Sequence, residues 1–180
     1  VNEILDYSRI ISSKFKIDNK PFELKETIDE VVDLAAFQCS QKKIDWHFNM
    51  DDSGLDDSFV VSDPFRLKQI LTNLIGNAYK FTEEGHIRIA AYINDDQFFT
   101  ISIQDTGIGI EKGNQKLVFE EFAQANEGIE KKYGGTGLGL SICQKIISIL
   151  GGKLSLESTF GKGSTFEIQL PLLFDNSIST

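Results

Sequence analysis

The sequence predicts an α/β sandwich, in which a mixed, largely antiparallel sheet of about five strands is covered on one face by about three helices. Two pairs of segments, at residues 86–105 and 153–172, alternate apolar and polar residues around a short turn. Three segments, at residues 24–41, 64–81 and 138–150, carry apolar residues at helical spacing. Strands joined by short turns pair antiparallel, and the apolar stripes of the helices need one face of that sheet to cover.

The chain begins inside a helical pattern. Val1, Ile4, Ile11 and Phe15 are separated by 3, 7 and 4 residues, which places them on one stripe with no evident partner in this chain. The stripe indicates either a helix that lies on its own domain or the tail of a dimerising helix cut from its context. We therefore expect the chain to be a fragment of a longer protein.

The other elements follow from periodicity and turn residues. Ser62-Asp63-Pro64 supplies a capping oxygen followed by proline, and so begins the helix at residues 64–81. Gly151-Gly152 terminates the helix at residues 138–150. The remaining expected segments are a loop around Asn19 and Pro21, strands at 44–50 and 59–61, a glycine turn at 105–110, a short helix ending near Phe122, a polar segment at 123–136 and a frayed tail at 175–180.

Composition excludes several classes of protein. The net charge of −9, without a basic cluster, argues against a nucleic-acid partner. No apolar run reaches the length of about 18 residues that a membrane span needs, so we expect no membrane contact by this fragment. Cys39 and Cys143 lie far apart in apolar helical settings, which favours two reduced core thiols over a disulfide or a metal pair.

Polar residues gather on one flank of the helix at residues 64–81. Arg66, Asn73, Asn77 and Lys80 share this flank at the border between core and solvent. Such residues usually mark a solvated surface. Asparagine is a mediocre helix former, however, so two of them one turn apart suggest a use for their carbonyl oxygens. One such oxygen, with ligand phosphates and waters, would suffice to bind Mg²⁺.

Asp105 ends a strand on the same face as three large apolar residues, Phe99, Ile101 and Ile103. A carboxylate on a buried face needs hydrogen-bond donors. An adenine amino group is one suitable donor, and the glycine turn that follows would open the backbone to it. The alternative is an Asp that closes an Asx turn at a strand end, which by itself is the commoner situation.

The run YGGTGLGLSI at residues 133–142 enters an apolar helix. It is not a GxGxxG loop, because Gly135, Gly137 and Gly139 are spaced two and two. Nor is there a Walker A loop at Gly161-Lys162, because Leu156 stands where that motif needs glycine. What remains is a glycine turn at a helix N-terminus, which is a generic anion site.

Together and in order, these segments resemble the N, G1, F and G2 boxes of the sensor histidine kinase ATP-binding domain, a member of the Bergerat-fold ATPase and kinase superfamily. The resemblance covers nearly the whole chain, and its polar run at residues 122–142 is similar to that of hybrid sensor kinases. Residues 5–10 look like the end of the second dimerisation helix, which would explain the stripe at the start. The four boxes are NLIGNAYKFT (73–82), DTGIGI (105–110), FEEF (119–122) and GTGLGL (135–140).

The resemblance implies a role for each matching residue. Asn77 would ligate Mg²⁺, with Asn73 supporting it and Lys80 near the phosphates of ATP. Asp105 would bind the adenine amino group. Residues 123–134 would be a mobile lid, and Phe119 with Phe122, by default core residues, would form a hinge and a contact with the dimerisation domain. The other implied nucleotide contacts are Gly107, Gly109, Lys131, Lys132, Tyr133, Gly135, Thr136, Gly137, Leu138, Gly139 and Leu140.

The implied function is to bind ATP with Mg²⁺ and to position its γ-phosphate for transfer to a histidine in two-component signalling. The sister ATPases place a water-activating Glu where Asn73 stands, and an amide cannot take a proton from water. His47 and His86 lie in strand patterns without a following acidic residue, so the acceptor histidine would be absent from this chain. One alternative is an inactive nucleotide-sensing or scaffold module. Another is an anti-sigma-type serine kinase, but the dimerisation-helix end at the start of the chain argues against that kinase.

The implied organisation is a dimerisation-helix end at residues 1–16, the catalytic domain at 17–174 and a tail or linker at 175–180. Expected partners are the dimerisation and phosphoacceptor domain of the same protein, within a full-length homodimer, and the receiver domain of a response regulator. The parent would be a membrane-bound sensor with this domain in the cytoplasm.

Overall fold

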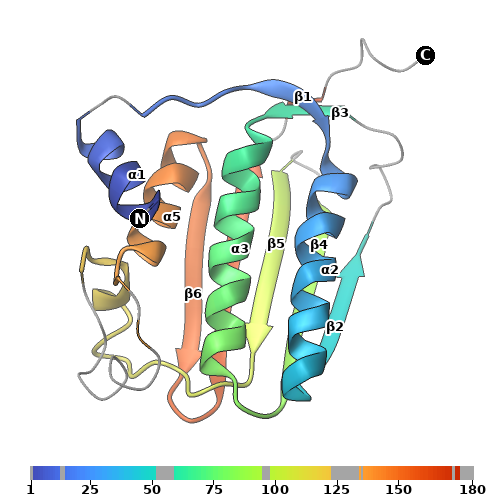
Figure 1. Ribbon diagram of the computed structural model, residues 1–180, viewed down its shortest axis with the longest axis vertical. Helices are drawn as coiled ribbons and strands as arrows, with labels where there is room; N and C mark the ends of the chain where they lie inside the picture. Colours follow the sequence, from blue (N-terminus) through green and yellow to red (C-terminus); the bar gives the residue numbers. More distant parts are fainter. Residues whose placement is uncertain are drawn as a thin grey trace.

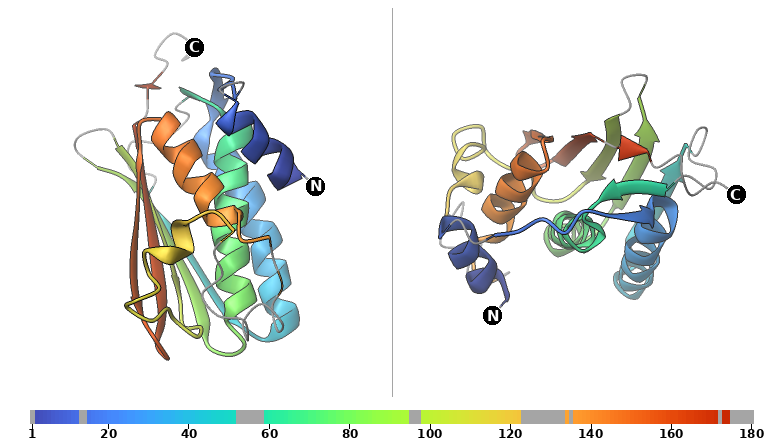
Figure 2. Two further views of the ribbon diagram at one scale, coloured as in Figure 1. Left: turned by 90° about the vertical axis from the view of Figure 1, so that its left-hand side faces the viewer. Right: turned by 90° about the horizontal axis from the view of Figure 1, so that it is seen from above.

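The structure is a computed structural model, which describes residues 2–12, 15–51, 59–94, 98–122, 134, 136–171 and 173–174. A five-stranded sheet forms one layer, and helices cover one of its faces (Figures 1 and 2). The strand order is β2-β4-β5-β7-β6. The strands of this sheet are β2 (Asp45–Met50), β4 (His86–Ile93), β5 (Phe98–Asp105), β6 (Lys153–Thr159) and β7 (Gly163–Pro171).

Pairing within the sheet is mixed, as the sequence predicts. The pairs β4–β5, β5–β7 and β6–β7 are antiparallel, while β2–β4 is parallel. The parallel pair follows from the connection, because β3 and the long helix α3 separate β2 from β4 along the chain and return it to the same end of the sheet. The predicted α/β sandwich is confirmed.

The covering helices are α2 (Leu24–Lys42), α3 (Pro64–Phe81) and α5 (Gly139–Ile149). α3 begins where the sequence predicts, because the Asp63 side chain accepts a hydrogen bond from the backbone N–H of Arg66 and Pro64 occupies the first turn. The apolar side of the sheet and the helices share one core. Its largest fully buried members are Phe99, Leu24, Ile28, Ile70, Leu71, Leu74, Ile87, Ile89, Ile101, Ile103, Leu138 and Ile142.

A second, small sheet lies at one end of the molecule (Figure 1). It has the order β1-β3-β8, from β1 (Lys20–Glu23), β3 (Phe59–Ser62) and β8 (Leu173–Phe174). The sequence predicts only its middle strand and places a loop where β1 lies. Strands of two to four residues are too short to show an alternating pattern, and only pairing between distant segments forms them.

The N-terminal helix α1 (Asn2–Ile11) packs on its own domain beside α5 (Figure 1). Tyr7 and Ile10 lie against the core, whereas Ile4 and Ile11 remain exposed. The stripe is therefore exposed at Ile4 and Ile11, as expected, and of its described members only Phe15, beyond the end of α1, packs against the core.

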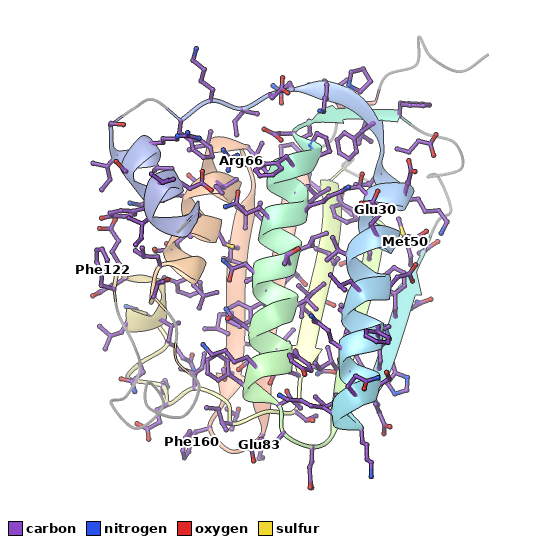
Figure 3. The ribbon with its side chains drawn as sticks, in the orientation of Figure 1. Glu30, Met50, Arg66, Glu83, Phe122 and Phe160 are labelled. Carbon is purple, nitrogen blue, oxygen red and sulfur yellow. The ribbon has the colours of Figure 1, made fainter. Side chains whose placement is uncertain are left out.

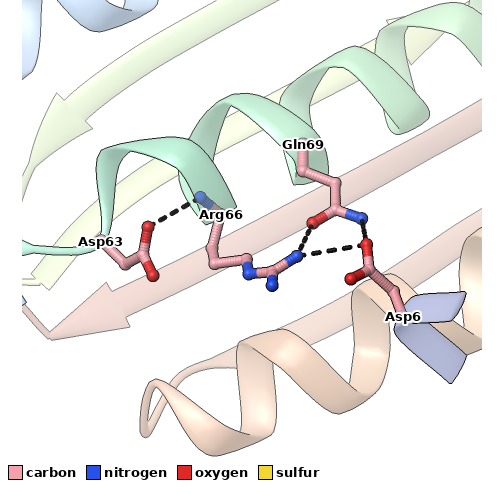
Figure 4. Close-up of polar contacts among 4 residues, drawn as sticks. All are labelled: Asp6, Asp63, Arg66 and Gln69. Atoms are coloured by element: carbon pink, nitrogen blue, oxygen red, sulfur yellow. Dashed lines mark hydrogen bonds and ion pairs between the residues drawn. The ribbon is translucent and has the colours of Figure 1, made fainter. Parts of the chain in front are cut away.

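A buried polar cluster joins α1 to α3 (Figure 4). The Arg66 guanidinium lies 3.2 Å from an Asp6 carboxylate oxygen, and both side chains are about nine-tenths buried (10% and 11% exposed). The same guanidinium donates to Gln69 Oε1 at 2.6 Å, and the Gln69 amide donates to Asp6 at 2.8 Å. The aromatic ring of Phe15 covers the guanidinium at 4.3 Å. Arg66 therefore belongs to this junction and not to the polar flank on which the sequence places it.

Replacing Arg66 with alanine is expected to lower the free energy of unfolding by about 3–5 kcal/mol, because it leaves the Asp6 carboxylate buried without its cation. The control is Lys68→Ala on the same helix, whose exposed ion pair with Glu30 should contribute less than about 1 kcal/mol. Urea denaturation of both variants measures the difference. Equal losses would show that the Asp6–Arg66 pair is no more than a surface contact.

The structure also bears on the cysteines, on the short helix before Phe122 and on membrane spans. Cys39 and Cys143 are buried free thiols, as predicted. The short helix before Phe122 is a single 3-10 turn, η1 (Leu117–Phe119). Within the described segments, no helix has the length and apolarity that crossing a bilayer demands.

Candidate functional site

The polar flank of α3 lies where this helix meets the start of α5. Asn73, Asn77 and Lys80 are all half-buried, and their spacing of four and three residues keeps them on one side of the helix. The Asn73 side chain lies directly against Gly139, where an added Cβ would come within 2.6 Å of its Oδ1 atom. Any larger residue at Gly139 would therefore displace Asn73, so glycine here sets the separation of the two helices.

The N-terminus of α5 has no side-chain cap. Its N-cap residue is Leu138, which is fully buried and offers no hydrogen-bond acceptor. The preceding Gly137 has a φ of 70°, and the Leu138 backbone N–H bonds the hydroxyl of Thr136 at 3.3 Å. The first N–H groups of a helix lack intrahelical partners and lie at the positive end of its dipole. This end of α5 is therefore a favourable position for an anion.

Lys80 reaches from α3 towards the segment that leads into α5. Its ammonium group donates a hydrogen bond to the carbonyl of Gly134, and it lies 5.0 Å from the centre of the Phe81 ring. Lys80 therefore brings a positive charge to the chain that immediately precedes the glycine run. The predicted site residues Lys131, Lys132, Tyr133 and Gly135 lie outside the described residues, as does the predicted lid at 123–134 apart from Gly134.

Asp105 ends β5 on the buried face, as predicted, with only 7% of its surface exposed. Its carboxylate accepts hydrogen bonds from the backbone N–H of Gly107, at 2.8 Å, and of Ser164. Burial raises the pKa of Asp105 above its usual value, and these two hydrogen bonds offset part of that rise. The bond to Gly107 is the Asx turn that the sequence left open, so Asp105 is held in place by its own turn.

The turn after Asp105 meets the C-terminal end of α3. An added Cβ at Gly107 would collide with the carbonyl oxygen of Phe81 and would lie 2.9 Å from Asp105 Oδ1. Phe81 also accepts a hydrogen bond from the backbone N–H of Ile108, at 3.2 Å. Gly107 is therefore required for this close approach, and the carboxylate of Asp105 lies next to the end of the polar flank.

The site thus has two chemically different ends along α3. The eight helical steps from Asn73 to Phe81 rise by about 12 Å. The start of α5 lies at one end of this length, and the buried acceptor Asp105 lies at the other. Both α3 and β5 finish at the same end of the molecule (Figure 1). This arrangement fits an elongated ligand with an anionic end and a hydrogen-bond donor at the other.

One buried polar group at this site received no role from the sequence, although it ends the first of the four boxes. The hydroxyl of Thr82, directly after α3, is fully buried and has no hydrogen-bond partner among the described residues. An unsatisfied buried hydroxyl costs free energy unless a ligand or water completes it. Thr82 is the last residue of the NLIGNAYKFT box, but its burial without a partner can be seen only in the folded structure.

The FEEF segment links the site to α1. Phe119 is half-buried and its ring lies 6.4 Å from that of Phe166. Phe122 is 63% exposed and its ring packs edge-on against Tyr7 at 5.6 Å, so the default expectation that it is a core residue is wrong. Glu121 bonds both the Tyr7 hydroxyl and the Lys145 ammonium. The chain is thereby tied to α1 and α5 at residues 119–122.

Comparison with known families bears on this geometry. Residues 62–173, which include α3, the Asp105 turn and α5, match the family described as histidine kinase-, DNA gyrase B- and HSP90-like ATPase. The chain belongs to this family. It is an ATP-binding catalytic domain of the type found in two-component histidine kinases.

Individual relatives agree. The chain is 41% identical over 176 residues to the signal transduction histidine-protein kinase BarA of Escherichia coli strain K12, covering 96% of this chain but only 19% of that protein. Among solved structures, full-length ShkA in complex with AMPPNP superposes with a TM-score of 0.82 at 28% identity, covering 97% of this chain and 35% of that one. Histidine kinase ThkA in complex with response regulator protein TrrA superposes with a TM-score of 0.71 at 29% identity, covering 94% and 47%.

Proposed function

We propose that this domain binds ATP with Mg²⁺ and positions the γ-phosphate for transfer to a histidine outside the chain. One observation carries the proposal: two different binding features lie along α3. The buried carboxylate of Asp105 lies near the C-terminal end of α3, and the uncapped N-terminus of α5 lies beside Asn73. The adenine amino group would donate to Asp105, and the phosphates would receive N–H groups from the glycine run into α5.

The polar flank of α3 would serve the phosphates. Asn77 has no side-chain partner within the described residues, so its amide oxygen is available to a divalent cation that prefers oxygen ligands. Asn73, held against Gly139, would support that position from the turn before. Lys80 would add positive charge. Bound Mg²⁺ would neutralise phosphate charge, while the chain supplies orientation and electrostatics.

The same residues argue that the domain does not activate water efficiently. An amide such as Asn73 cannot accept a proton at neutral pH, so the described flank of α3 holds no general base. The two histidines occupy the strands β2 and β4 at one side of the sheet, whereas α5 packs against β6 at the other edge. The nucleophile would therefore come from another domain. We also propose that the catalytic domain extends from residue 17 to residue 174.

Partners follow from the same reasoning. α1 would continue upstream as the dimerisation and phosphoacceptor helix of a homodimeric parent, and the phosphoryl group would pass to the receiver domain of a response regulator. The ThkA–TrrA complex supports such a partner, and AMPPNP in ShkA supports a nucleotide at this site. The chain spans about a fifth of the length of BarA, so a membrane-bound sensor as the parent is likewise a proposal.

The direct test mixes this domain with the upstream helical segment of its parent and ATP labelled on the γ-phosphate. Label should appear on a histidine of the helical segment, and the domain alone should remain unlabelled. The domain carrying Asn77→Ala is the matched control and should transfer no label. Tight nucleotide binding without any label in the mixture would instead favour the inactive sensing or scaffold module.

A further inference from the structure

The turn between β6 and β7 packs against the turn at residues 105–110, which we call the Asp105 turn. The Gly161 backbone N–H donates to the carbonyl of Ile108 at 2.7 Å. Gly109 has a φ of 66°, and an added Cβ there would strike the carbonyl of Thr159. Gly163 has a φ of 118°, and an added Cβ there would strike the carbonyl of Asp105. The two turns are thus fitted to each other by backbone contact, and Phe160 is exposed at the same end of the molecule (Figure 3).

Ser158 is the side chain at the centre of this contact. Its hydroxyl oxygen accepts a hydrogen bond from the backbone N–H of Ile110 at 2.8 Å. The same oxygen lies 3.0 Å from the carbonyl of Gly163 and 2.9 Å from the hydroxyl of Ser164, either of which can accept its proton. The Gln115 amide adds bonds to the carbonyls of Ser158 and Ile110, at 2.9 and 3.1 Å. Ser158 therefore fixes the end of the Asp105 turn to the start of β7.

The start of β7 in turn holds Asp105. Ser164 pairs with Asp105 across the antiparallel strands β5 and β7, and its backbone N–H donates to the Asp105 carboxylate. A continuous set of hydrogen bonds thus runs from Ile110 through Ser158 and Ser164 to the carboxylate. Gly107 holds the same carboxylate from the other side at 2.8 Å. The orientation of Asp105 depends on both ends of its turn being fixed.

We propose that Ser158 is a positioning residue for adenine recognition, acting through Ser164 and the Asp105–Ile110 turn. The inference rests on the proposed adenine role of Asp105 and deepens it. Without the hydroxyl, the Ile110 N–H loses its partner and the turn must be ordered when the base binds, which weakens binding. GTP presents a carbonyl where adenine presents its amino group, so it gains nothing from a well-placed carboxylate.

The test compares ATP and GTP affinities of the whole domain by calorimetry, with and without Ser158→Ala. The variant should bind ATP about three- to tenfold more weakly while its GTP affinity stays unchanged, so the preference for ATP shrinks by the same factor. The control is Ser155→Ala on the same strand, whose side chain lies on the opposite face and which should leave both affinities unchanged. Equal weakening of ATP and GTP by Ser158→Ala would overturn the proposal.

Asp105→Asn, measured in parallel, separates this inference from the proposed function. If Asp105→Asn leaves the ATP preference unchanged, the adenine role of Asp105 is wrong. If Asp105→Asn removes the preference and Ser158→Ala does not reduce it, only the role of Ser158 is wrong. Should Ser158→Ala fail to fold, Ser164→Ala decides by the same criterion, because it removes the hydroxyl partner of Ser158 but keeps the N–H that Asp105 accepts.

Discussion

Replacing Asn77 with alanine is expected to weaken Mg²⁺-dependent ATP binding by at least about 100-fold. Changing residues that merely support a metal ligand typically costs ten- to 100-fold in affinity, and losing the ligand itself should cost more. The fold should survive, because Asn77 is half-buried, makes no side-chain hydrogen bond within the described residues, and alanine is the better helix former. Calorimetric titration with ATP, in the presence of Mg²⁺ and again with a chelator, measures the effect.

The chelator makes this prediction specific to the metal. Without Mg²⁺, the wild-type domain and the Asn77→Ala variant should bind ATP with similar, weak affinity. Thr72→Ala is a suitable control, since Thr72 is exposed on the same helix and should not change either affinity. If Asn77→Ala binds ATP as tightly as the wild type when Mg²⁺ is present, Asn77 is not the metal ligand.

Replacing Asp105 with asparagine is expected to weaken ATP binding by roughly ten- to 100-fold, because a hydrogen bond to a charged acceptor typically contributes about 1.5–3 kcal/mol. Asparagine has almost the same shape but presents an NH₂ group as well as an oxygen. GTP affinity should change little, so the preference for ATP should largely disappear. Asp45→Asn, an exposed carboxylate at the start of β2, is the control and should leave the preference intact.

The same variant has a predictable effect on stability. Burial raises the pKa of Asp105 in the folded state, so folding favours its protonated form. That favourable contribution is fully present below the ordinary pKa of Asp and is lost as the pH rises through the raised value. Asp105→Asn should therefore be at least as stable as the wild type at pH 7, with the difference vanishing in acid. Urea denaturation at pH 7 and below pH 4 measures this, and a variant that is less stable at pH 7 would contradict it.

The faces on which the polar residues of α3 and β5 lie could be predicted, because each face follows from the side-chain period of its element. Asn73, Asn77 and Lys80 share a flank through the period of the helix, and Asp105 faces the core through the period of the strand. The folded chain keeps both elements, since α3 and β5 end where the sequence predicts. The resemblance then assigned roles that spacing alone left open, as at residues 133–142, where no familiar phosphate loop matched.

Other expectations failed where distant segments meet. Arg66 has the same helical phase as the site residues, yet its guanidinium bonds Asp6, 60 positions away. By default Phe122 would be a core residue, although the resemblance made it a contact residue. Its backbone turns with a φ of 59° and its ring packs on Tyr7, 115 positions earlier. Periodicity reports which side of an element a residue occupies, and it carries no information about which other segment lies there.

The sequence by itself determined the α/β class, the bounds of α3, the burial of Asp105 and the order of the four boxes, since these depend on local propensity and side-chain period. Only the tertiary structure decided that α1 docks through Asp6, that a second small sheet forms, and that the β6–β7 turn holds the Asp105 turn through Ser158. The physical reason is that such contacts join segments tens of residues apart, and their stability comes from burial and hydrogen-bond satisfaction that exist only once the chain has folded.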